Sequence, residues 1–187
     1  MAKAEVGWQK YLVEALEGLD SGGLLLSSLD DGGRANAMTI GWASFGVMWG
    51  RPTAVVLVRP SRYTFGCIEA TGDFAVSVPY PEMADAVKFC GTKSGRNVDK
   101  FAECGFTALN VDGVRSPGIA ECGLVFFCRV LHRNDVLPPE LDRDVQTTCY
   151  PSGDYHRFYH GEISVVLADQ DFVSRRLQAD RQADRRA

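Results

Sequence analysis

One segment of the sequence combines residue types that bind a phosphate group. The segment 59–64 (RPSRYT) follows a β-branched run and precedes a helical pattern. Free main-chain N–H groups at a helix N-terminus, together with the helix dipole, favour an anion. Ser61 is a favoured N-cap residue, Arg62 can add a charged contact, and Thr64 can add a hydroxyl. From this pattern alone, an ordinary capped surface helix is an equally good interpretation.

Two further segments could contribute to the same site. Residues 92–96 (TKSGR) offer two cations, two hydroxyls and a flexible backbone that can wrap an anion, although a solvated turn is the better interpretation of this segment alone. The Gly-Lys-Ser/Thr ending of a nucleotide-binding P-loop is absent. Residues 36–42 (NAMTIGW) mix apolar side chains with main-chain donors, which suit the edge and faces of a flat heteroaromatic ring. The alternative is a barrel strand with Trp42 in the core.

The histidines and cysteines give weaker signals. His156 and His160 are four residues apart, but metal binding would need a third ligand that the sequence does not identify, so no metal site is predicted. Six cysteines show no Cys-x-x-Cys pairing, and we interpret Cys122 and Cys128 as small hydrophobic residues of strands. The Gly-x-Ser-x-Gly pattern of serine hydrolases is absent.

Length and charge narrow the function classes. The chain has 187 residues and a net charge of −4, which fits one domain and argues against a general nucleic-acid binder. No apolar stretch is long enough to cross a bilayer, and residues 1–16 indicate an amphipathic helix rather than a signal peptide. We therefore expect a cytoplasmic protein with a domain over residues 1–168. Residues 169–187 would form a charged, solvated tail rather than a functional arm.

A strand-rich framework must position these candidate residues. Helical patterns are expected at 8–19, 61–70, 81–89 and 100–103. Strand patterns are expected at 23–29, 36–44, 53–58, 73–78, 106–109, 111–114, 121–132 and 157–167, with 23–44 forming a hairpin and 135–151 irregular. This order predicts a mainly β fold, a closed or nearly closed antiparallel barrel with helices packed outside. The glycine fingerprint of a Rossmann fold is missing.

Taken together, the segments resemble the flavin-reductase-like family of FMN-binding split barrels, and within it the flavoredoxin group. The matching stretches are 36–44, 58–79, 91–101 and 156–166, and the resemblance runs from about residue 6 to 168. It implies an antiparallel split β-barrel with peripheral helices, and a homodimer that holds FMN near the dimer interface.

The resemblance also implies which residues form the site. The isoalloxazine ring would be edged by the main chain of Met38, Thr39, Ile40 and Gly41. The phosphate and ribityl end would be held by Ser61, Arg62, Tyr63 and Thr64. The second loop would close over the phosphate or the ring with Ser94, Gly95, Arg96, Lys100 and Phe101. The nicotinamide would enter near the flavin face beside His160.

The implied function is an FMN-dependent oxidoreductase that passes electrons from NADH or NADPH through flavin to a downstream acceptor. The flavin supplies that chemistry, so no dedicated acid or base is required of the protein. One alternative is a flavoredoxin-like electron carrier reduced by a protein partner. Another is a barrel that binds a ligand without redox chemistry.

Overall fold

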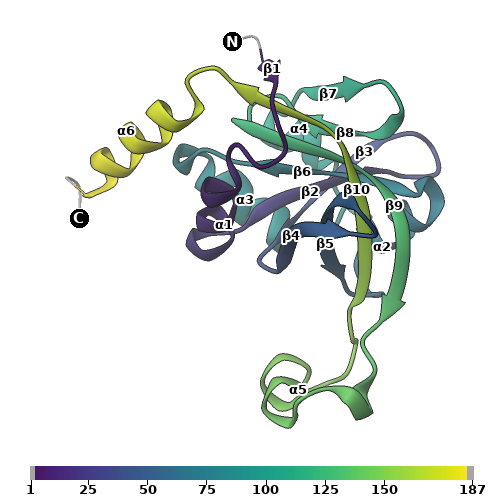
Figure 1. Ribbon diagram of the computed structural model, residues 1–187. Coiled ribbons are helices and arrows are strands. Elements are labelled where there is room, and N and C mark those ends of the chain that lie inside the picture. The colour runs from purple at the N-terminus through teal and green to yellow at the C-terminus, as the bar shows by residue number, and fades with distance from the viewer. Residues whose placement is uncertain (1–2, 185–187) are drawn as a thin grey trace.

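The computed structural model describes residues 3–184, and an antiparallel sheet forms its centre (Figure 1). The strand order is β3-β2-β6-β9-β10-β5-β4, and β1 pairs with β10. The strands of this sheet are β1 (Lys3–Glu5), β2 (Leu24–Leu29), β3 (Ala35–Ile40), β4 (Ala43–Met48), β5 (Arg51–Val58), β6 (Asp73–Val78), β9 (Leu124–Asp135) and β10 (Arg157–Asp169). A separate ribbon consists of β7 (Ala108–Val111) and β8 (Val114–Ile119).

The helices surround this sheet, which confirms the expected mainly β fold with peripheral helices. They are α1 (Leu12–Ser21), α2 (Tyr63–Thr71), α3 (Ala84–Thr92), α4 (Lys100–Cys104), α5 (Arg143–Cys149) and α6 (Phe172–Asp184). Figure 1 shows α5 beyond one end of the long β9–β10 pair and α6 extending from the other end. In residues 3–184 no ladder joins β3 to β4, so the barrel is split rather than closed. Within that range, no helix has the length and apolar character needed to span a bilayer.

The central strands are apolar at nearly every position because both faces of the sheet are buried. Side chains alternate between the faces of a strand, so Leu24 and Leu26 enter one core cluster with Phe126. Leu25 enters a second cluster with Phe127. Residues of α1, β5 and β10 complete the first cluster, and residues of α3, α4 and β8 complete the second. The second cluster thereby anchors the helices on both sides of the loop at 93–99.

Among the differences between the expected and the observed element boundaries, two shape the candidate site. The strand expected at 36–44 is broken at Gly41 and Trp42, because β3 pairs with β2 whereas β4 pairs with β5. The helix expected from Ser61 begins later, with Arg62 as its N-cap residue. The chain therefore turns a corner at 41–42 and leaves the first turn of α2 open at its N-terminus.

The chain after residue 168 is more ordered than a solvated tail. β10 continues to Asp169, whose carboxylate accepts hydrogen bonds from Tyr80 (2.8 Å) and Lys3 (2.9 Å). Phe172 at the start of α6 is fully buried and its ring centroid lies 5.2 Å from that of Tyr11. The tail interpretation therefore does not hold for these first residues, and positions 185–187 lie outside the described residues.

Candidate functional site

A cavity of about 390 Å³ lies where β3, the N-terminus of α2 and the loop at 93–99 meet. All three segments singled out in the sequence contribute to its walls. The predicted site residues that line it are Met38, Thr39, Ile40, Gly41, Ser61, Arg62, Tyr63, Thr64, Ser94, Gly95, Arg96 and Lys100. The predicted residues that share this cavity thus span 62 positions of the sequence, from Met38 to Lys100.

The N-terminus of α2 offers free donors to this cavity. Arg62 is the N-cap residue in an extended conformation (φ −76°, ψ 142°), and its side chain makes no capping hydrogen bond. Among the described residues, no acceptor is found for the main-chain N–H groups of Tyr63 and Thr64. Both residues line the cavity. Such N–H groups and the positive end of the helix dipole favour an anion at this position.

Lys100 places a buried positive charge at the same cavity. Its side chain is 4% exposed, and its Nζ donates to the Cys90 carbonyl at 2.7 Å. No carboxylate forms an ion pair with Lys100 in the part of the chain that the structure describes. Burial, and to a smaller extent the charge of Arg62, lowers the pKa of the Lys100 ammonium. Because buried charges normally have a partner, this unpaired cation is suited to an anionic ligand.

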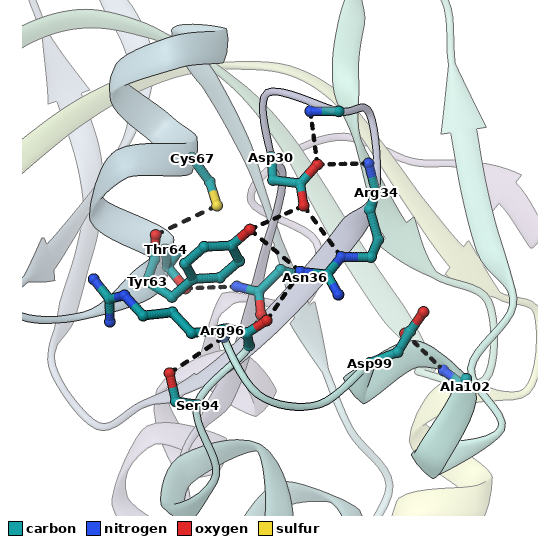
Figure 2. Close-up of polar contacts among 12 residues, drawn as sticks. Asp30, Arg34, Asn36, Tyr63, Thr64, Cys67, Ser94, Arg96, Asp99 and Ala102 are labelled. Atoms are coloured by element: carbon teal, nitrogen blue, oxygen red, sulfur yellow. Dashed lines mark hydrogen bonds and ion pairs between the residues drawn. The ribbon is translucent and has the colours of Figure 1, made fainter.

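Tyr63, which lines the cavity, is hydrogen-bonded to the turn between β2 and β3 (Figure 2). Its hydroxyl donates to Asp30 Oδ2 at 2.9 Å and accepts from Arg34 at 3.3 Å, and Arg34 also donates to the Gly95 carbonyl at 3.0 Å. The Arg96 guanidinium lies 5.5 Å from the Tyr63 ring centroid. The Arg34 main-chain N–H is the largest cause that lowers the pKa of the Asp30 carboxyl. Asp30 and Arg34, which sequence reasoning missed, therefore hold the loop of Gly95 in place.

Asn36 and Gly95 make the closest approach between the strand and the loop. Asn36 is 3% exposed, and its Nδ2 donates to Thr64 Oγ1 at 2.8 Å. Its Oδ1 is buried without a hydrogen-bond partner among the described residues. A Cβ atom on Gly95 would lie 2.1 Å from this Oδ1 and 2.7 Å from Tyr63 Cδ1. Only glycine allows the loop to pack this closely against β3.

Another part of the wall is formed by three residues that are not among the predicted cofactor-binding residues. Trp42, Arg59 and His156 all line the cavity. His156 Nδ1 lies 2.8 Å from the Tyr150 hydroxyl, and its ring centroid lies 5.0 Å from that of Trp42. Burial, and then the charge of Arg59, lowers the pKa of His156 to about 4, so the imidazole is neutral at pH 7. Arg59 donates to the Cys149 carbonyl at 2.8 Å, which ties the C-terminal end of α5 to this wall.

Ser61 is less available than its sequence position indicates. Its Oγ donates to Asp154 Oδ2 at 2.6 Å, and its main-chain N–H donates to Asp154 Oδ1 at 3.3 Å. Two other predicted residues lie outside the cavity. Phe101 is buried in the second core cluster, with its ring centroid 5.8 Å from that of Phe106. His160 lies within β10, whereas His156 directly precedes that strand, and four residues of extended chain span about 13 Å.

Comparison with known proteins agrees with this architecture. Residues 16–172 match the model of the flavin reductase like domain family. A flavoredoxin from Methanosarcina acetivorans is 29% identical, with a TM-score of 0.64 over 80% of this chain and 69% of that chain. A flavoredoxin from Desulfovibrio vulgaris (Miyazaki F) is 24% identical, with a TM-score of 0.65 over 80% and 70% of the two chains. An FMN-binding domain of a flavin reductases-like enzyme from Shewanella baltica is 20% identical, with a TM-score of 0.63 over 91% and 78%.

The last two structures, at these identities, are evidence for the fold alone. An uncharacterized protein from Archaeoglobus fulgidus is 32% identical over 98 residues, which are 52% of this chain and 55% of that protein. An uncharacterized protein from Pyrococcus abyssi is 32% identical over 105 residues, or 56% and 59%. The chain thus spans little more than half the length of these curated relatives. Because the family model covers most of the sequence, the chain belongs to the flavin reductase-like domain family.

Proposed function

We propose that the chain binds FMN in the cavity of about 390 Å³. The single observation that carries this proposal is the buried, unpaired Lys100 beside Arg62 and the open N-terminus of α2. A phosphate group there would neutralise the two cations and accept from the free N–H groups of Tyr63 and Thr64. The flavin reductase-like domain family and the flavoredoxin from Methanosarcina acetivorans support a flavin as the ligand.

The isoalloxazine ring would lie along the corner at residues 38–41. There the chain passes from β3 toward β4, and its main-chain groups are not all used by the sheet. Trp42 and the neutral His156 provide aromatic surface on the adjoining wall. Arg96 and Gly95 would cover the phosphate side from the opposite loop. In this arrangement His156 occupies the place beside the ring that the sequence resemblance gives to His160.

The proposed activity is that of an FMN-dependent oxidoreductase using NADH or NADPH. Bound FMN supplies the electron-transfer chemistry, and the protein holds it and tunes its charge environment. The cations Arg62 and Lys100 neutralise the phosphate, while donors at residues 38–41 would stabilise negative charge that develops on the ring. The second candidate is an electron carrier reduced by a protein partner. It is favoured by the flavoredoxin from Methanosarcina acetivorans, at 29% identity.

One spectroscopic experiment separates these functions. Purified protein is saturated with FMN, freed of excess flavin, and mixed anaerobically with NADH or NADPH while the visible flavin absorbance is followed. We expect at least one of the two nicotinamides to bleach the absorbance of the bound flavin within about a second, the timescale of a typical enzyme turnover. Bleaching by dithionite but by neither nicotinamide would contradict the reductase and favour the carrier. A protein that retains no FMN would contradict both and favour a barrel without redox chemistry.

We also propose that the protein is a cytoplasmic homodimer. All six cysteines are free, which fits a reducing compartment.

Exposed apolar side chains support the dimer. Val13 and Leu16 on α1 are 66% and 50% exposed, and Leu177 on α6 is 52% exposed. These helices lie on the same side of the molecule in Figure 1, where a second copy would cover them. Light scattering coupled to size-exclusion chromatography should give twice the chain mass of 20.5 kDa, and a monomer mass would contradict the dimer.

A further inference from the structure

A cluster of histidine, methionine and tryptophan lies outside the proposed flavin cavity. His160 on β10 stands directly opposite His132 on β9, and their ring centroids are 5.3 Å apart. Met48, at the end of β4, places its Sδ 3.3 Å from His160 Nδ1. The sequence identified no third ligand for a metal site at His156 and His160. Strand pairing instead brings two other potential ligands, His132 and Met48, next to His160. None of these three residues lines the flavin cavity.

The hydrogen bonding of His160 leaves an unusual contact with Met48. His160 Nε2 lies 2.8 Å from Asn134 Oδ1, which is an acceptor, so Nε2 carries the proton. His160 Nδ1 then presents a lone pair to the Met48 sulfur, which also presents lone pairs. No proton lies between the nitrogen and the sulfur, so their lone pairs face each other. A cation between the two atoms would accept both lone pairs and make the contact attractive. Metal-binding histidines commonly donate the distal N–H to a carbonyl or carboxylate oxygen in this way.

The remaining features of the cluster suit the same cation. The Trp49 ring centroid lies 6.0 Å from that of His132 and 5.9 Å from that of His160. Trp49 has a φ of 52°, a left-handed conformation that is rare for a residue with a large side chain. The turn therefore holds an aromatic face beside the two imidazoles, where it can contact a cation.

We propose that Met48, His132 and His160 bind Cu(I), with Trp49 as an aromatic cap. Thioether sulfur selects soft ions such as Cu(I), and imidazole is also a good ligand for copper. Within residues 3–184 there is no group of three or more His, Cys, Asp or Glu able to hold a metal, so the methionine completes this set. The sequence identified no third ligand for His156 and His160, because residue spacing along the chain cannot reveal a thioether ligand on another strand.

Competition for Cu(I) tests the site directly. The FMN-saturated protein, with Cys104→Ser and Cys149→Ser to remove the two half-buried thiols, is titrated anaerobically into Cu(I)–bicinchoninate. The other four cysteines are buried. We expect withdrawal of about one Cu(I) per chain, together with quenching of Trp49 fluorescence that is lost in Trp49→Phe. If the protein leaves the metal on the chelator, the proposal is overturned.

Matched variants in the same background show whether the proposed ligands hold the metal. Met48→Leu, a volume-conserving change, and His132→Asn, at an exposed position, should each weaken Cu(I) binding by at least about tenfold. Met83→Leu, at a partly buried methionine that packs against both core clusters, should bind Cu(I) like the parent. Equal affinity in Met48→Leu, His132→Asn and the parent would overturn the site. Flavin content and circular dichroism, measured for each variant, establish that it is folded.

Discussion

Replacing Lys100 with methionine should weaken FMN binding while leaving the flavin-free protein as stable as, or more stable than, the parent. Lys100 is 4% exposed and has no carboxylate partner among the described residues, so its charge opposes folding until an anion binds. A charge-assisted hydrogen bond to phosphate contributes about 1.5–3 kcal/mol, or roughly 10- to 150-fold in affinity. Fluorescence titration with FMN and urea denaturation of the flavin-free protein measure the two effects.

Riboflavin provides the decisive control because it lacks the phosphate. Lys100→Met should leave riboflavin affinity nearly unchanged, and Lys88→Met, at an exposed position on the neighbouring helix α3, should leave both affinities unchanged. An equal loss for FMN and riboflavin would show that Lys100 does not contact the phosphate. An unchanged FMN affinity would place the phosphate elsewhere in the cavity.

The pH dependence of stability gives a further readout of Lys100. Its pKa is lowered in the folded, flavin-free protein. Between that lowered value and the ordinary value, the unfolded chain binds more protons than the folded chain, so the free energy of unfolding rises with pH. This rise should be smaller in Lys100→Met, and bound FMN should reduce it because the phosphate favours the charged ammonium.

Replacing Gly95 with alanine should disrupt the loop that covers the phosphate side. The new Cβ would lie 2.1 Å from Asn36 Oδ1 and 2.7 Å from Tyr63 Cδ1, so the loop must move away from β3. That movement would also strain the hydrogen bond from Arg34 to the Gly95 carbonyl. Overpacking of this kind costs about 1–3 kcal/mol, and we expect FMN affinity to fall by at least about tenfold.

Gly66 is the matched control for this substitution. It lies on the exposed face of α2, and a Cβ there would meet no atom within 4 Å. Gly66→Ala should therefore stabilise the protein by about 0.5–1 kcal/mol through helix propensity and leave FMN affinity unchanged. Urea denaturation and FMN titration are measured on both variants. Parental affinity in Gly95→Ala would contradict the proposed role of the loop.

Much of the fold could be predicted because its signals are local. The hairpin of β2 and β3 follows from apolar runs on either side of the turn at Asp31–Gly33, and the observed register pairs Leu24 with Ile40. The helix within residues 135–151 could not be seen because α5 is short, with its capping residue Asp142 as the main signal. The break at Gly41–Trp42 was missed because it depends on β4 pairing with β5, which is separated from β3 in the sheet.

The amino-acid sequence by itself determined the strand-rich domain, the three segments at 36–44, 58–79 and 91–101, and the resemblance to one family. Those properties depend on residue type and short spacing, which the chain displays directly. Only the tertiary structure decided that Lys100 is a buried cation without an ion-pair partner among the described residues. It also decided that the Ser61 hydroxyl donates its hydrogen bond to Asp154. It also gave the two histidines different surroundings. His156 lies beside Trp42, whereas His160 lies beside Met48 of β4 and His132 of β9, and these neighbours are too distant in the sequence for a local pattern to reveal them.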